Sequence, residues 1–172
     1  YAHCSAQTGA GRSLVCGGEW ADERLSSTLL LPAGDAAQWS RAADLASSRV
    51  GAGCAVVAAA DARAHRVLVV GGEDSNYLAL DSCECYDDAM DRWVEQDPRL
   101  PETMCCCAAS VAGGSAILAV QTNDNVDKTR CMLLDLRSSR WQRVASPKIS
   151  REMHTVCSVG EHSVVMLGGL NH

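Results

Sequence analysis

The sequence contains no phenylalanine, and aromatic residues make up only 4% of its 172 positions, although hydrophobic residues make up 47%. Its interior volume must therefore come from aliphatic residues, cysteine, methionine and four tryptophans. The apolar runs are far shorter than the roughly 20 residues of a membrane-spanning helix, and no secretory signal pattern occurs. We therefore expect no membrane partner, and a chain of this length can enclose one sizeable core.

Positive charge is also scarce, since 15 lysines and arginines face 21 aspartates and glutamates, for a net charge of −6. No basic run appears. Proteins that bind nucleic acid neutralise phosphates with clustered lysine and arginine. We therefore expect no nucleic-acid partner.

Enzyme motifs are missing as well, because the sequence has no G-x-S-x-G, P-loop or dinucleotide fingerprint. The five histidines form no ligand-spaced cluster. His3 and His154 precede a glycine pair by the same distance, which indicates a duplicated structural position rather than catalysis. We expect neither catalytic residues nor a cofactor.

What the sequence does contain is a repeated pattern, in which an apolar run, a glycine pair, a loop and a second apolar run lead to a tryptophan. A repeat of about 50 residues is typical of four-stranded propeller blades. The runs alternate and are too short for ordinary helices, which predicts strands. The marks of the pattern are, in chain order, Gly17 with Trp39, Gly71 with Trp93, Gln121 in place of a glycine with Trp141, and Gly168 near the end.

A second regular spacing supports this repeat pattern. The same offset after each tryptophan leads to Arg49, Thr103 and Arg151, each of which opens a small-residue or apolar run. We expect blades at 1–48, 49–102 and 103–150 and a partial blade at 151–172. The regular spacing of the three tryptophans favours packing between blades over a ligand-stacking set.

The segment from Asp81 to Trp93, which reads Asp-Ser-Cys-Glu-Cys-Tyr-Asp and then Arg-Trp, resembles a kelch repeat of the kind found in BTB-kelch ubiquitin-ligase adaptors. Residues 49–57 resemble the first strand of such a blade. The resemblance implies an all-β fold, a kelch-type β-propeller segment of about three and a half four-stranded antiparallel blades. Closed rings have four to eight blades. We therefore expect a larger ring and a longer parent chain.

The resemblance also implies a function. It indicates a protein–protein interaction module that recognises substrates within a ubiquitin-ligase adaptor or serves a cytoskeletal scaffold, and not an enzyme. The alternative is a fragment of a kelch-type enzyme similar to the copper oxidases, whose active residues lie outside this segment.

Blade topology predicts where a partner binds, because loops after the second and fourth strands emerge on one face. In the adaptors that the sequence resembles, an arginine opening the inner strand can contact an acidic partner segment, and Arg49 and Arg151 match that position. The alternative is that these arginines only tie loops together. Trp20 is a candidate anchor, with folding back onto its own blade as the alternative. The expected partner-binding residues are Arg49, Arg151, Glu73, Asp74, Asn76, Asn123 and Trp20.

Ten cysteines remain to be explained. Several lie inside apolar runs, where a thiol packs as a small hydrophobe. We expect Cys54, Cys131 and Cys157 to be reduced and buried, in a cytoplasmic protein. The pair Cys83 and Cys85 and the run 105–107 lack the ligand spacing of ordinary zinc sites, so we expect no metal.

Overall fold

The computed structural model describes residues 2–34, 38–58, 65–105, 107–112, 116–123, 126–148, 154–160 and 163–169. Every regular element in these ranges is a β-strand. Among the residues that the structure describes, there is no helix with the length and apolarity needed to cross a membrane.

The first sheet has four antiparallel strands and carries a small hairpin outside it. The hairpin follows the second strand of the sheet, where a plain loop was expected. The sheet order is β1 (Cys4–Gln7), β2 (Ser13–Cys16), β5 (Thr28–Leu31) and β6 (Ser40–Ala42), and the hairpin is β3 (Glu19–Trp20) with β4 (Glu23–Arg24).

The next two sheets repeat this arrangement with consecutive strands. A two-stranded sheet follows them, formed by β15 (Thr155–Val159) and β16 (Ser163–Leu167). The second sheet contains β7 (Gly53–Ala58), β8 (His65–Val70), β9 (Cys83–Asp87) and β10 (Arg92–Gln96), and the third contains β11 (Cys107–Ala112), β12 (Ala116–Asn123), β13 (Val126–Asp135) and β14 (Arg140–Val144).

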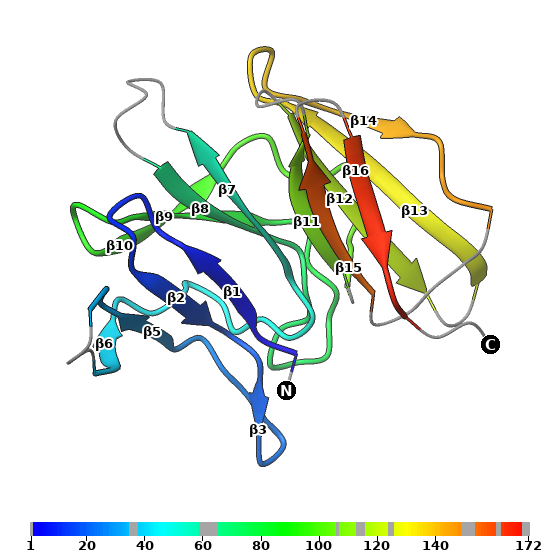
Figure 1. Ribbon diagram of the computed structural model, residues 1–172. Helices are drawn as coiled ribbons and strands as arrows, with labels where there is room; N and C mark the ends of the chain where they lie inside the picture. Colours follow the sequence, from blue (N-terminus) through cyan, green and yellow to red (C-terminus); the bar gives the residue numbers. More distant parts are fainter. Residues whose placement is uncertain are drawn as a thin grey trace.

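The first strands of successive sheets lie side by side, β1 against β7, β7 against β11 and β11 against β15, and the other strands extend away from them (Figure 1). This is the arrangement of consecutive propeller blades, and the described residues form no closed ring. The predicted fold class, an all-β propeller segment built from four-stranded antiparallel sheets, is confirmed.

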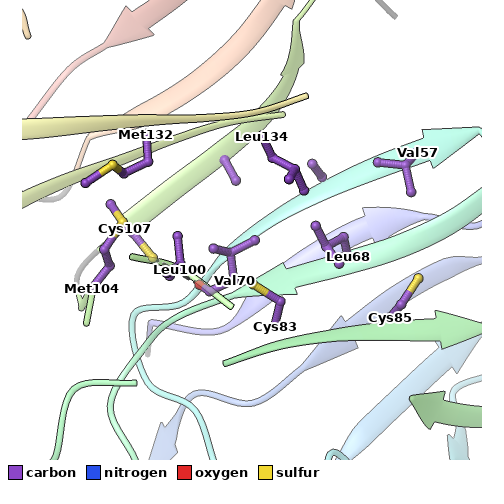
Figure 2. Close-up of a cluster of buried hydrophobic side chains, with 12 residues drawn as sticks. Val57, Leu68, Val70, Cys83, Cys85, Leu100, Met104, Cys107, Met132 and Leu134 are labelled. Carbon is purple, nitrogen blue, oxygen red and sulfur yellow. Dashed lines mark hydrogen bonds between the residues drawn. The ribbon is translucent and has the colours of Figure 1, made fainter. Parts of the chain in front are cut away.

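The core lies between neighbouring sheets, and strand alternation explains it. Successive side chains of a strand point to opposite faces. Val67 and Val69 of β8 therefore pack against the first sheet, whereas Leu68 and Val70 pack toward the third. Figure 2 shows the second of these clusters, to which Leu134 from the third sheet and Leu68 from the second both belong. Each sheet thus needs a neighbour on each face to bury its apolar residues.

The glycine pairs form the same sharp turn in different repeats. Gly17 and Gly71 have φ angles of 64° and 63°, which side chains disfavour. A Cβ atom on Gly17 would lie 2.5 Å from the carbonyl oxygen of Arg49, and one on Gly71 would collide with the carbonyl of Met104. The turn therefore requires glycine for its backbone angle and for the close approach of the next crossing segment.

The third repeat lacks the glycine pair, and its second strand continues where the other repeats turn. Where the repeat pattern predicts a loop after Gln121, the chain forms an extension of a hairpin, because β12 runs to Asn123 and β13 begins at Val126. A register shift marks the change between Gln121 and Asn123. Without glycine to make the turn, the chain stays extended and keeps pairing.

The structure corrects one repeat position. The backbone N–H of Gly18 donates to the Arg49 carbonyl at 2.8 Å, and in the next repeat Gly72 donates to the Met104 carbonyl at 2.7 Å. Met104, rather than the expected Thr103, is therefore the counterpart of Arg49. The second crossing is one residue longer than the first, so the fixed offset from tryptophan fails there.

Trp93 and Trp141 occupy equivalent places between sheets. The indole N–H of Trp93 donates to the carbonyl of Ala43, and that of Trp141 donates to the carbonyl of Pro98, each on the preceding crossing segment. Trp39 lies just before β6 and is 50% exposed. The predicted packing between blades therefore holds for Trp93 and Trp141.

Candidate functional site

The β3–β4 hairpin projects from one end of the first sheet (Figure 1). Its two turn residues, Ala21 and Asp22, both have positive φ angles, of 49° and 65°. Two such residues form the tight turn that suits a two-residue hairpin. Leu25 N–H donates to the Gly18 carbonyl at 2.9 Å and closes the base of the hairpin. The segment is therefore an ordered projection.

The corresponding segment of the second repeat, residues 73–79, is a compact loop at the same end of the neighbouring sheet. Its ends are joined by a bridge between Glu73 and Ala79. Inside it, one Asp74 carboxylate oxygen accepts the N–H groups of Asn76 and Leu78, at 2.8 and 3.0 Å. These hydrogen bonds lower the pKa of Asp74, and the one from Leu78 contributes most. The carboxylate therefore stays ionised and holds the loop closed.

This loop presents two large side chains to solvent. Tyr77 is 68% exposed and Leu78 is 61% exposed. Tyr77 also has a φ angle of 62°, which is unusual for a bulky residue. The hydrogen bonds of Asp74 therefore hold an aromatic and an aliphatic side chain outward in a strained but fixed conformation.

Arg24 joins the hairpin of the first repeat to the loop of the second. Its guanidinium lies 2.7 Å from a carboxylate oxygen of Glu73, and its central carbon lies 3.9 Å from the centre of the Tyr77 ring. The Arg24 side chain is only 8% exposed. Burial, the largest single effect, lowers the pKa of Arg24, but the hydrogen bond with Glu73 and the charges of Glu73, Tyr77 and Glu19 together outweigh it, so the pKa is raised. Arg24 therefore remains charged and fixes the position of Tyr77.

Trp20 lies on the other face of the hairpin. In the register of the hairpin Glu19 pairs with Arg24 and Trp20 pairs with Glu23. Paired residues share a face, so Trp20 points away from the side of Arg24. It is 74% exposed, so it does not fold back onto its own sheet. A hollow of about 200 Å³ lies beside it, lined mainly by Val15, Leu25 and Leu29 together with the hairpin.

The structure contradicts the partner-binding role that the sequence predicted for Arg49. Its side chain was expected to meet a partner, but only 2% of the residue is exposed. Its guanidinium donates to Glu84 at 2.9 and 3.0 Å, to the Gly71 carbonyl at 2.7 Å, and to the carbonyl and hydroxyl of Ser82. The donors that would recognise an acidic segment are used inside the protein. The alternative, an arginine that ties segments together, describes Arg49.

The other expected residues divide into three groups. Glu73 and Asp74 belong to the junction just described, and Asn76 is exposed beside them. Asn123 ends β12, where its backbone pairs with Val126 and Asp127. Arg151 lies outside the described residues.

Sequence reasoning missed Arg24, Tyr77 and Leu78. One signal was present, because Asp74-Ser-Asn is a turn-forming run placed directly before two bulky apolar residues. Nothing in the sequence indicated that Arg24 would reach the neighbouring repeat, since that contact depends on how two sheets pack. We call the surface formed by Glu19, Arg24, Glu73, Asp74, Tyr77 and Leu78 the junction surface.

A second feature is a cavity of about 270 Å³ between the inner strands, to which β1, β7, β11 and β15 all contribute. The thiols of Cys4, Cys54 and Cys107 line it and donate to backbone carbonyls at 3.0–3.1 Å. A hydrogen bond with Cys16, together with burial, raises the pKa of Cys4, and burial raises the pKa of Cys107 to about 12. These groups are therefore neutral thiols that satisfy buried carbonyls.

The thiol predictions hold only in part. The described cysteines are free, and Cys131 is buried as expected. Cys54 is partly buried, and Cys157 is exposed, which contradicts its expected burial. Burial raises the pKa of Cys83 to about 12 and that of Cys85 to about 11. Over the described ranges, no three histidine, cysteine or acidic side chains are placed to hold a metal ion.

The fold and this site define an all-β repeat protein with kelch-like blades. The chain is similar to beta-scruin of Limulus polyphemus, a kelch-repeat protein, with 27% identity over 116 residues. The match covers 63% of this chain but only 12% of beta-scruin, so the chain spans a small part of that relative's length. No family model matches the chain.

Proposed function

We propose that this chain is a protein-interaction module and that its partner binds the face that carries the β3–β4 hairpin and the loop at residues 73–79. The observation that carries the proposal is the Arg24 contact, which locks two loops from different repeats into one surface with Tyr77 and Leu78 exposed. Aromatic residues and arginine are enriched among the residues that dominate binding energy at protein interfaces. The similarity to a kelch-repeat protein also supports a binding role.

We further propose that the module selects proteins within a ubiquitin-ligase adaptor or a cytoskeletal scaffold. The resemblance of residues 81–93 to the adaptor repeats supports the first setting. Glu73, Asp74, Asn76 and Trp20 remain our proposed contact residues, with Tyr77 and Leu78 added to them. Arg49 is the described residue that was expected to contact an acidic partner segment, and it is buried, so it does not support that kind of partner.

The test compares two exposed apolar residues at opposite ends of the same sheet. Tyr77 follows β8, whereas Met90, which is 64% exposed, lies in the β9–β10 turn at the other end. A partner would be captured with the full-length protein and its affinity measured by titration. Because truncation of a central aromatic residue costs about 2 kcal/mol or more, Tyr77→Ala should weaken binding by about 30-fold.

Met90→Ala is the control and should bind as the unmodified protein does. Thermal melts of both variants would check that the fold is intact. Equal affinity for the two variants, or a loss of binding for Met90→Ala alone, would place the interface elsewhere.

A further inference from the structure

We propose that the partner segment that docks on the junction surface is basic, with lysine or arginine next to an apolar side chain. This inference rests on the proposed function and names the chemistry of its partner. Three properties of the surface carry it, namely a fixed apolar anchor, an excess of carboxylates, and a cation that is already engaged.

The anchor is fixed before any partner arrives. The N–H of Tyr77 donates to the Asp74 carbonyl at 3.1 Å, and Asp74 N–H donates to the Leu78 carbonyl at 3.0 Å. Together with the side-chain hydrogen bonds of Asp74, these contacts hold Tyr77 in a conformation that glycine or asparagine would adopt more easily. Strained residues that persist in a well-braced loop are concentrated at binding sites. A fixed side chain loses little entropy when a partner packs against it.

The charge around the anchor is negative. Glu19, Glu73 and Asp74 all interact electrostatically with Arg24, so three carboxylates surround one guanidinium. One more carboxylate, that of Asp22, lies on an exposed turn residue of the hairpin. An acidic segment would meet repulsion here, whereas a basic one gains attraction and faster association.

The single cation of the surface does not reverse this balance. The side chain of Arg24 is largely buried, donates to Glu73 and lies over one side of the Tyr77 ring. Its charge is therefore already paired with groups of the junction surface. The exposed part of Tyr77 and the side chain of Leu78 can pack the aliphatic stem of a lysine or arginine, whose charged end then reaches the carboxylates.

The experiment uses three short fluorescein-labelled peptides in which leucine alternates with lysine, glutamate or serine. Their binding to the full-length protein would be measured by fluorescence polarisation at low and physiological salt. Because like charges suppress wrong partners, the lysine peptide should bind at least about tenfold more tightly than the glutamate peptide. Its affinity should fall as salt rises.

Two variants and one control separate the effect of charge from that of the apolar anchor. Asp74→Asn keeps an oxygen that can accept the same two N–H groups but removes the charge, so affinity for the lysine peptide should fall about threefold. Tyr77→Asn keeps a residue that tolerates the positive φ but removes the ring, and should lower affinity about tenfold or more. Tyr77→Phe should bind normally.

Asp135→Asn is the matched control. Asp135 caps the β13–β14 turn at the opposite end of its sheet, where its carboxylate accepts the N–H of Arg137 at 2.8 Å. The same substitution there changes net charge equally but leaves the junction surface intact, so lysine-peptide affinity should not change. An equal loss for both aspartate variants would show attraction to the acidic protein as a whole and overturn the proposal.

Tighter binding of the glutamate peptide, or an unchanged affinity after Asp74→Asn, would also overturn it. The two proposals fail differently. A captured partner that depends on Tyr77 but shows no preference for the lysine peptide contradicts only the charge of the partner. A partner that ignores Tyr77 contradicts the proposed binding face itself.

Discussion

Arg49 occupies a buried position that holds a charged residue at one repeat interface and an apolar residue at the next. Between the first and second sheets, Arg49 pairs with Glu84, and both side chains are almost completely inaccessible to water. At the next interface Met104 is the counterpart of Arg49. Met132 is the counterpart of Glu84, because each lies two residues before the strand partner of its repeat's tryptophan. Both methionines belong to one buried cluster (Figure 2). Buried ion pairs can often be replaced by apolar residues of similar volume with little loss of stability. This chain contains both arrangements, an ion pair at one interface and two methionines at the next.

This comparison predicts a specific pattern of stabilities. Glu84→Ala leaves the Arg49 charge buried and uncompensated, which should lower the free energy of unfolding by about 3–5 kcal/mol. The double variant Arg49→Met with Glu84→Met copies the next interface and should lose clearly less than Glu84→Ala alone. Urea unfolding of the variants measures both values. A double variant as unstable as Glu84→Ala would mean that the ion pair, and not the filled volume, holds this interface.

Residue type alone did not reveal where Arg49 would lie. Its position at the start of an inner strand matched a partner-contacting arginine, and its charge suggested exposure. The structure buries it because Glu84, two carbonyls and a hydroxyl lie around it, and those partners come from another strand and loop. Arrangements of this kind depend on packing between sheets, which a single sequence does not display.

At the scale of elements, the glycine pair decides whether a repeat turns or continues. With the pair, the chain turns sharply and leaves its sheet to form the hairpin at 19–24 or the loop at 73–79. Without it, β12 and β13 extend into a longer hairpin. The face that carries the junction surface is therefore shaped repeat by repeat.

Substitution of the turn glycines should separate backbone strain from steric collision. Gly11 has a φ angle of 75°, and a Cβ there would meet nothing within 4 Å, so Gly11→Ala should cost only about 1 kcal/mol. Gly71→Ala adds the collision with the Met104 carbonyl and should cost more than about 2 kcal/mol. Chemical denaturation of both variants compares the two. Equal costs would contradict the close approach at Gly71.

Much of the strand pattern was predictable, and what was missed has a physical reason. Alternating apolar runs predicted strands, and every regular element in the described residues is a strand, because strand periodicity is local. The hairpin at 19–24 was missed because its strands have only two residues each. Trp20 was recognised as a candidate anchor, but Tyr77 was not, because its importance comes from Arg24 in the neighbouring repeat.

At the scale of the whole molecule, both the core and the junction surface belong to pairs of repeats rather than to single ones. Apolar clusters lie between adjacent sheets, and Arg24 of one repeat positions Tyr77 of the next. In repeat proteins of this kind, stability is the sum of repeats and their interfaces. Binding at the junction surface should therefore also stabilise the contact between the first two sheets.

Hydrogen–deuterium exchange of the full-length protein, with and without its captured partner, tests the central claim that the partner binds this face. Bound partner should slow exchange in peptides that cover residues 19–25 and 73–79, because their backbone N–H groups would open less often. Peptides that cover the β9–β10 turn at the opposite end should exchange unchanged. Protection confined to that turn, with none at 19–25 or 73–79, would contradict the account.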